Sequence, residues 1–167
     1  MKKLYILVLS AILFMGVQTF AGDVATKPVV PEKTAAIATD NFNYSAYSKV
    51  NPLDVVAKPN FYLNKNIKVT GKFDKFSTLG LDYEPAMKSS EKFIAFLIQR
   101  PDVADHNLPL SEMKCFMPRE DAEKYIELNS GDRIEFYGTV YSTALGDVWV
   151  DVKKFVALDK KPETDKK

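Results

Sequence analysis

The sequence predicts a mostly β fold: a closed five-stranded Greek-key barrel, with a helix between its third and fourth strands and a short N-terminal helix. Three observations predict it. Five strand-like runs and one helical pattern follow one another within residues 67–156. Apolar and polar residues alternate in the first, fourth and fifth runs, as in half-buried strands. The last two runs flank a tight turn, and their apolar phases can face one common core.

The short N-terminal helix is predicted to begin at the Asn-Pro pair at residues 51–52. Asparagine is a favoured N-cap, and proline suits the first helical position. Leu53, Val56 and Ala57 then share one face, and the Lys-Pro pair at 58–59 ends the helix. We expect this helix to cover one end of the barrel.

The first strand is predicted over residues 67–73, where apolar residues alternate with lysine and threonine. Its apolar phase then slips, because Phe76 follows Phe73 by three positions. A β-bulge adds one residue to a strand and restores the phase. We therefore expect a bulge near Asp74 and Lys75.

The second and third strands are predicted over residues 93–98 and 112–117. The second is apolar on both faces, so either both faces are covered by other parts of the protein or one face presents side chains to a ligand. The loop before it, residues 79–92, is long enough for a function of its own. The third strand places the sulfur-containing residues 113, 115 and 117 on one side and Lys114 and Phe116 on the other.

A helix is predicted to begin after Pro118, with acidic residues in its first turn, where the helix dipole favours them. Ala122, Tyr125 and Ile126 form its apolar stripe, and the glycine at 131 ends it. We expect this stripe to pack against the barrel.

The last two strands form a hairpin whose register follows from parity. Their apolar phases face one core only if opposing residue numbers add up to an even value, and a turn centred near Leu145 makes that value 290. This register places Thr139 opposite Asp151. It also predicts two outer pairs, Tyr141 with Trp149 and Tyr137 with Lys153, which either stabilise the sheet or form a ligand platform.

The chain is expected to divide into four segments. Residues 1–21 have a basic start, an apolar stretch and small residues before the cleavage point, which predicts a signal peptide cleaved after Ala21. The apolar stretch is shorter than the ~20 residues of a spanning helix, which disfavours a retained anchor. We expect a disordered linker over 22–44, the barrel domain over 45–158 and a charged, disordered tail over 159–167. The mature protein should be periplasmic or secreted, with no transmembrane segment after signal cleavage.

The charge balance disfavours nucleic acid as a partner. The full chain has 23 basic and 22 acidic residues, and loss of the signal peptide removes two lysines, which leaves 21 against 22. Proteins that bind nucleic acid through phosphates normally carry a clear basic excess. A local patch, such as the lysines at 65, 68, 72 and 75, stays open as an alternative to an evenly mixed, solvated surface.

No catalytic residue, metal site or cofactor is predicted. The single histidine, His106, has Asp102 and Asp105 nearby, but three such residues in a loop more often form a solvated connection than a metal site. Cys115 has no second cysteine to pair with in the chain. Its phase predicts burial as a small apolar residue, with an intermolecular disulfide as the alternative.

The element order, with the runs IKVTGK at 67–72 and SGDRIEFYG at 130–138, resembles secreted bacterial oligonucleotide/oligosaccharide-binding (OB) fold proteins and the tRNA-anticodon-binding-like OB group. The resemblance implies ligand binding across the second and third strands, framed by the loops after the first and fourth. The candidate ligand-binding residues are then Phe96, Lys114, Phe116, Tyr83 and Leu145.

We therefore expect an exported, non-catalytic binding module of the OB fold, with an unidentified small or polymeric ligand or an envelope protein as its partner. The alternative is a single-stranded nucleic-acid-binding domain, which fold analogy supports but charge and export disfavour. A third hypothesis is an envelope stress or assembly factor that acts through its linker.

Overall fold

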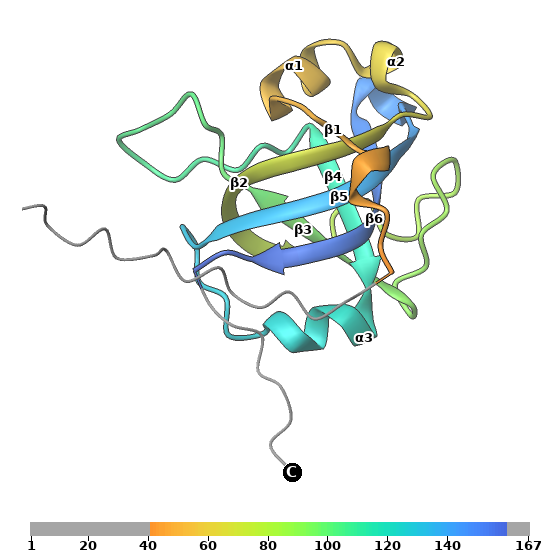
Figure 1. Ribbon diagram of the computed structural model, residues 1–167. Helices are drawn as coiled ribbons and strands as arrows, with labels where there is room; N and C mark the ends of the chain where they lie inside the picture. Colours follow the sequence, from red (N-terminus) through yellow and green to blue (C-terminus); the bar gives the residue numbers. More distant parts are fainter. Residues whose placement is uncertain (1–40, 160–167) are drawn as a thin grey trace, which may run out of the picture. The chain divides into compact units, whose positions relative to one another are not determined.

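The computed structural model of this protein describes residues 41–159. Five strands close into a barrel in the order β2-β3-β4-β6-β5, and pairing between β2 and β5 completes the ring (Figure 1). β4 and β6 run parallel, and all other neighbours in the ring are antiparallel. The predicted mostly β, five-stranded OB-fold barrel is confirmed. Its strands are β2 (Asn66–Ser77), β3 (Phe93–Ile98), β4 (Met113–Pro118), β5 (Arg133–Ser142) and β6 (Val148–Ala157).

The predicted signal peptide, most of the predicted linker and all but the first residue of the predicted tail lie outside the described residues. Within residues 41–159, no helix is both long and apolar enough to cross a membrane.

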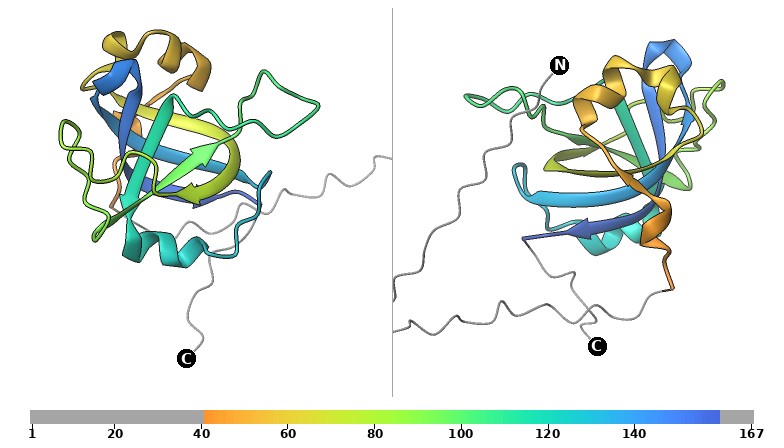
Figure 2. Two further views of the ribbon diagram at one scale, coloured as in Figure 1. Left: turned by 180° about the vertical axis from the view of Figure 1, so that it is seen from behind. Right: turned by 45° about the horizontal axis from the view of Figure 1, so that its top comes forward.

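Strand β2 bends round the barrel and pairs with two other strands of the barrel, β5 and β3 (Figure 2). Its first part, residues 66–72, pairs with β5, and its last part, from Phe73 on, pairs with β3. The register shifts between Phe73 and Lys75, which confirms the predicted bulge. A bulge bends the strand and increases its twist, which a small closed barrel requires.

The centre of the β5–β6 hairpin has the predicted register. Thr139 lies opposite Asp151, and Val140 lies opposite Val150. Gly138 belongs to this region because the strands approach closely here: a Cβ atom at Gly138 would lie 2.7 Å from a Val150 methyl carbon. Bulges on both sides of this centre shift the outer pairs. The prediction that Tyr141 lies opposite Trp149 is wrong by one residue, since Ser142 takes that position.

An N-terminal segment covers the face of β5 that points away from the barrel core. It contains η1 (Tyr44–Ala46) and β1 (Ser48–Lys49), which pairs in parallel with β2. The rings of Phe42 and Tyr47 stack at 5.2 Å, and both meet the ring of Tyr137 edge-on. Tyr137 is buried as a result. The bulge beside Gly138 places Lys154 opposite Tyr137, so the predicted Tyr137–Lys153 pair is wrong.

Helix α1 (Pro52–Ala57) begins as predicted: the Asn51 side chain accepts a hydrogen bond from the Leu53 N–H at 2.9 Å. Its buried residues are Pro52 and Val55, whereas Ala57 is exposed, so the predicted apolar face is only partly correct. A second short helix, α2 (Pro59–Tyr62), follows where the chain was expected to leave the helix. The two helices lie beside the barrel end, as expected (Figure 1).

Helix α3 (Arg119–Ala122) is shorter than predicted and continues as a 3-10 turn, η2 (Glu123–Tyr125). Ala122 is buried, and the Tyr125 hydroxyl donates a hydrogen bond to the Phe155 carbonyl at 2.7 Å. Ile126 was predicted to share their stripe but is 71% exposed. The 3-10 turn rotates successive side chains by more than an α-helix does, which ends the stripe at Tyr125.

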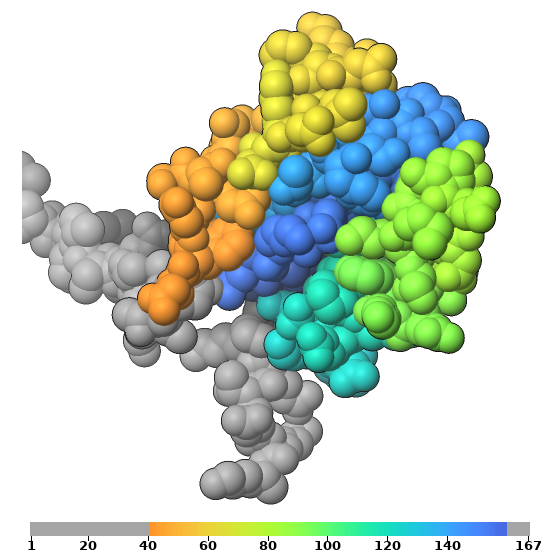
Figure 3. All heavy atoms as spheres, turned by 90° about the vertical axis from the view of Figure 1, so that its right-hand side faces the viewer, coloured from red at the N-terminus to blue at the C-terminus, as the bar shows by residue number. Residues whose placement is uncertain are grey.

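Two hydrophobic clusters lie on opposite faces of β3 and β4. The larger fills the barrel. The smaller lies on the outer face, where loop 78–92 packs over Phe116, Trp149 and Ala95. Figure 3 shows this loop in light green beside the blue β5–β6 hairpin. Both faces of strand β3 are apolar because one packs in the barrel core and the other packs in the outer cluster beneath loop 78–92.

Candidate functional site

Two of the predicted ligand-binding residues have no exposed surface. Phe96 lies inside the barrel, where its ring meets those of Phe136 and Phe155 edge-on at 5.3 and 5.1 Å. Phe116 lies in the outer cluster, and its ring stacks on Trp149 at 5.6 Å. Neither ring can touch a ligand in this arrangement.

The other three predicted residues occupy different environments. Tyr83, in loop 78–92, stacks on Trp149 at 5.5 Å. Lys114 is buried, and its ammonium group pairs with Asp147. Leu145, in η3 (Ala144–Gly146), is 70% exposed. Tyr83, Lys114 and Phe116 therefore meet around Trp149. Leu145 follows Ala144, whose carbonyl accepts a hydrogen bond of 2.8 Å from the Trp149 indole N–H, but its own side chain is exposed. Phe96 lies apart from this group, inside the barrel.

Loop 78–92 closes the face that the OB resemblance implies for ligands. The loop is held by an ion pair of 2.9 Å between Lys88 and Asp151, with both side chains mostly buried. At Asp82 the carboxylate accepts a hydrogen bond of 2.8 Å from the Ser90 N–H, and hydrogen bonding by the Ser90 side chain and N–H lowers the pKa of Asp82. With this loop in place, Ala95 of β3 and Phe116 of β4 are buried beneath it on the outer face of the barrel.

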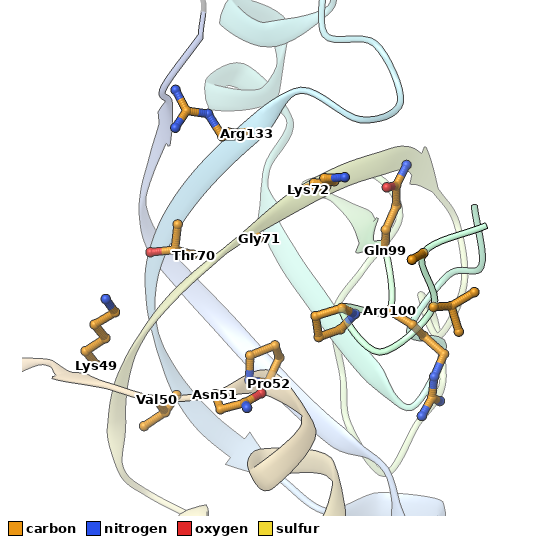
Figure 4. Close-up of a pocket in the computed structure, with 13 residues that line it drawn as sticks. Lys49, Val50, Asn51, Pro52, Thr70, Gly71, Lys72, Gln99, Arg100 and Arg133 are labelled. Atoms are coloured by element: carbon orange, nitrogen blue, oxygen red, sulfur yellow. The ribbon is translucent and has the colours of Figure 1, made fainter. Parts of the chain in front are cut away.

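A pocket of about 580 Å³ lies elsewhere, along the middle of β2 (Figure 4). Its walls come from the junction of β1 and α1, from β2, from the start of the loop after β3, and from the first residue of β5. Its lining residues are Lys49, Val50, Asn51, Pro52, Thr70, Gly71, Lys72, Gln99, Arg100, Pro101, Val103, Ala104 and Arg133.

The lining contains four cations and no carboxylate. Two of the cations have partners outside the lining. Arg100 pairs with Asp102 at 3.2 Å and with Glu112 at 2.8 Å, and these hydrogen bonds raise the pKa of its guanidinium. Arg133 pairs with Asp159 at 2.7 Å, which likewise raises the pKa of Arg133. Because both guanidinium groups are paired with carboxylates, the unpaired positive charge of the lining comes from its two lysines, and unpaired cations favour an anionic ligand.

The other two cations, Lys49 and Lys72, have exposed side chains and no ion pair within residues 41–159. Lys72 belonged to the lysine patch that the sequence left open. Two other lysines of that patch have partners outside the pocket: Lys68 pairs with Glu135 at 3.0 Å, and the ammonium of Lys65 lies 3.2 Å from the centre of the Phe61 ring. Only Lys72 of that patch lines the pocket.

Sequence reasoning missed this pocket because its cations lie far apart in the chain, between Lys49 and Arg133. Pairing of β1 and β5 with β2 brings them together. No spacing in the sequence marks them, apart from the position of Lys72 in an alternating strand.

The histidine loop has the geometry of a solvated connection. His106 Nδ1 lies 2.8 Å from the Asp105 carboxylate, and both side chains are largely exposed. Asp102 pairs with Arg100 instead, which lowers the pKa of Asp102. Across residues 41–159, no three His, Cys, Asp or Glu side chains come together as a metal site would require.

No family model matches this chain, and a search of curated proteins gave no match. Solved structures do match. A protein assigned as an aspartyl-tRNA synthetase from Leishmania major Friedlin aligns with 74% of this chain at 12% identity and a TM-score of 0.42; the alignment covers 23% of that protein. An OBody bound to hen egg-white lysozyme aligns with 60% of this chain and 85% of its own length, at 11% identity and a TM-score of 0.41. The fold assignment rests on strand order and register.

Proposed function

We propose that this protein is an exported, non-catalytic OB-fold module that binds an anionic ligand in the pocket beside β2. One observation carries the proposal: four cations and no carboxylate line a cavity large enough for a small molecule or a segment of a polymer. The lining contains no histidine, thiol or carboxylate, so lysine is its only candidate for a general base, which supports binding over catalysis.

Export is supported by the N-terminal sequence, which has the basic start, apolar stretch and cleavage pattern of a signal peptide. Expression in a bacterial host and fractionation of the envelope test it. We expect the protein in the periplasm or medium with Gly22 as its first residue. A full-length chain retained in the cytoplasm would contradict export.

Ligand binding is tested with inorganic tripolyphosphate, a small polyanion, added to the ¹⁵N-labelled full chain. We expect shifts of the Thr70 and Gly71 amides that saturate. The double substitution Lys49→Gln/Lys72→Gln should weaken binding about tenfold, since each exposed charge contact contributes modestly. The matched control Lys58→Gln/Lys75→Gln removes the same charge from exposed positions outside the pocket. Equal effects of the two pairs would show that binding depends on net charge alone and would refute a ligand site at this pocket.

Single-stranded nucleic acid is the competing ligand. Domains that bind it combine cations with aromatic rings on which bases stack, and the pocket lining contains no aromatic residue. A salt titration separates the two ligands. Oligonucleotide affinity that exceeds tripolyphosphate affinity and falls steeply with salt would favour nucleic acid.

A further inference from the structure

The pocket contains an unoccupied stretch of sheet edge, and the hydrogen bonds of β2 locate it. On the β5 side, the Val140 N–H donates to the Lys65 carbonyl at 3.0 Å, and the Phe73 N–H donates to the Asp132 carbonyl at 2.8 Å. The N–H and C=O groups of one strand residue point to the same edge, and successive residues alternate. No register shift interrupts the β2–β5 ladder. The odd-numbered residues from 65 to 73 therefore face β5.

The even-numbered residues of β2 face the opposite edge. There the Val50 N–H donates to the Lys68 carbonyl at 3.0 Å, and the Gln99 N–H donates to the Lys72 carbonyl at 2.8 Å. Thr70 lies midway between these two bonds, so its N–H and C=O point to the same edge. Strand β1 ends before Thr70, and the pairing of β3 with β2 begins after it. No described strand lies opposite these two groups.

This gap coincides with the pocket. Thr70 lines the pocket, with residues 49–52 on one side of it and residues 99–104 on the other (Figure 4). The distance along β2 from Lys68 to Lys72 is about 13 Å at the rise of a strand. Unpaired edges of this kind accept an additional extended segment, which bonds through its main chain.

We propose that the anionic ligand of this pocket is an acidic peptide segment in extended conformation, one residue of which exchanges two main-chain hydrogen bonds with Thr70. This inference rests on the proposed function and specifies its ligand. A peptide has both a donor for the Thr70 carbonyl and an acceptor for its N–H. A phosphate oxyanion has acceptors only, so it would leave the carbonyl without a partner.

The distribution of charge favours a chain over a compact anion. The four cations come from four different segments and do not converge on one point: Figure 4 shows Lys49 and Arg133 on one side of the pocket and Lys72 and Arg100 on the other. Acidic side chains that alternate along an extended segment can meet separated cations. The proline, valine and alanine residues of the lining provide an apolar surface for a side chain between them.

The experiment compares three probes on the full chain: a fluorescein-labelled Gly-Glu-Val-Glu-Gly peptide, in which acidic residues flank the valine that would lie opposite Thr70, the same peptide N-methylated at valine, and tripolyphosphate as a competitor. We expect the first peptide to bind and to slow hydrogen exchange of the Thr70 amide. N-methylation removes one main-chain donor at constant charge and should weaken binding about five- to tenfold. Lys49→Gln/Lys72→Gln should weaken it about tenfold, whereas Lys58→Gln/Lys75→Gln should change it less than about twofold.

The outcomes separate the two proposals. If tripolyphosphate binds and the peptide does not, or if N-methylation has no effect and Thr70 exchange is unchanged, the peptide inference is overturned and the anion pocket stands. If neither probe binds at low salt, both are overturned. Binding of a peptide made from residues 22–40 of this chain in place of the acidic probe would also overturn the acidic-partner inference, because that segment is not predominantly acidic.

Discussion

The substitution Phe96→Ala tests whether this ring supports the core or serves a ligand. Phe96 is completely buried and meets two other rings edge-on. Truncation of a buried phenylalanine costs about 3–5 kcal/mol of unfolding free energy. Each edge-to-face pair contributes about 0.5–1.5 kcal/mol beyond its buried area, so we expect a loss in the upper part of that range.

Urea unfolding measures this loss, with the fluorescence of the single tryptophan, Trp149, and far-ultraviolet circular dichroism as independent probes. With an m-value of about 2 kcal/mol/M, the midpoint should fall by about 2 M. Phe96→Leu keeps most of the side-chain volume and should lose about 1–2 kcal/mol, which keeps the test informative if the alanine variant does not fold. The exposed Phe61→Ala serves as control, with a loss of at most about 1 kcal/mol. A fall of less than about 0.5 M for Phe96→Ala would refute the core assignment.

Four further predictions concern the barrel. Gly138→Ala places a Cβ atom 2.7 Å from a methyl carbon and should lose about 1–3 kcal/mol in urea unfolding, whereas Gly71→Ala, with 3.6 Å to its nearest neighbour, should be tolerated. Tyr141→Phe removes a buried hydroxyl that has no hydrogen-bond partner within the described chain, so it should raise the free energy of unfolding by about 1 kcal/mol, which raises the urea midpoint by about 0.5 M; a lower midpoint would reveal a partner. Burial raises the pKa of the Cys115 thiol, so iodoacetamide should label it only after unfolding, as mass spectrometry would detect. Although burial desolvates Asp151, hydrogen bonds from two lysines hold its pKa below the usual value. This stabilisation is present above the unfolded pKa of about 3.9 and is lost as pH falls through the folded pKa, so Asp151→Asn should flatten the decline of stability below about pH 4.

Much of the barrel could be predicted because the alternation of apolar and polar residues along the chain specifies its strands. The alternation in β2 and the phase slip after Phe73 determine one strand and its bulge, since a strand exposes alternate faces. The parity rule gave the centre of the β5–β6 hairpin. It failed at the outer pairs, because the bulges beside Gly138 and after Val140 depend on how the closed barrel twists.

The site depended on contacts between distant segments. A strand that is apolar on both faces, such as 93–98, is compatible with a ligand surface or with a second cover. Loop 78–92 covers the outer face of this strand. No periodicity in the sequence of the loop predicts that it packs there. The pocket arises in the same way, because Lys49, Lys72, Arg100 and Arg133 meet only through strand pairing.

From its residues alone, this chain determined the five strands of the barrel, where α1 and α3 begin, which face of most strands is apolar, and how its final hairpin is centred. These properties depend on neighbours within a few positions. Only tertiary structure decided that Phe96 and Phe116 are covered, that Thr70 has no strand on the edge of β2 away from β5, and that four cations line one pocket. The physical reason is that burial and charge clustering are properties of surfaces brought together by barrel closure, and no local pattern encodes which surfaces will meet.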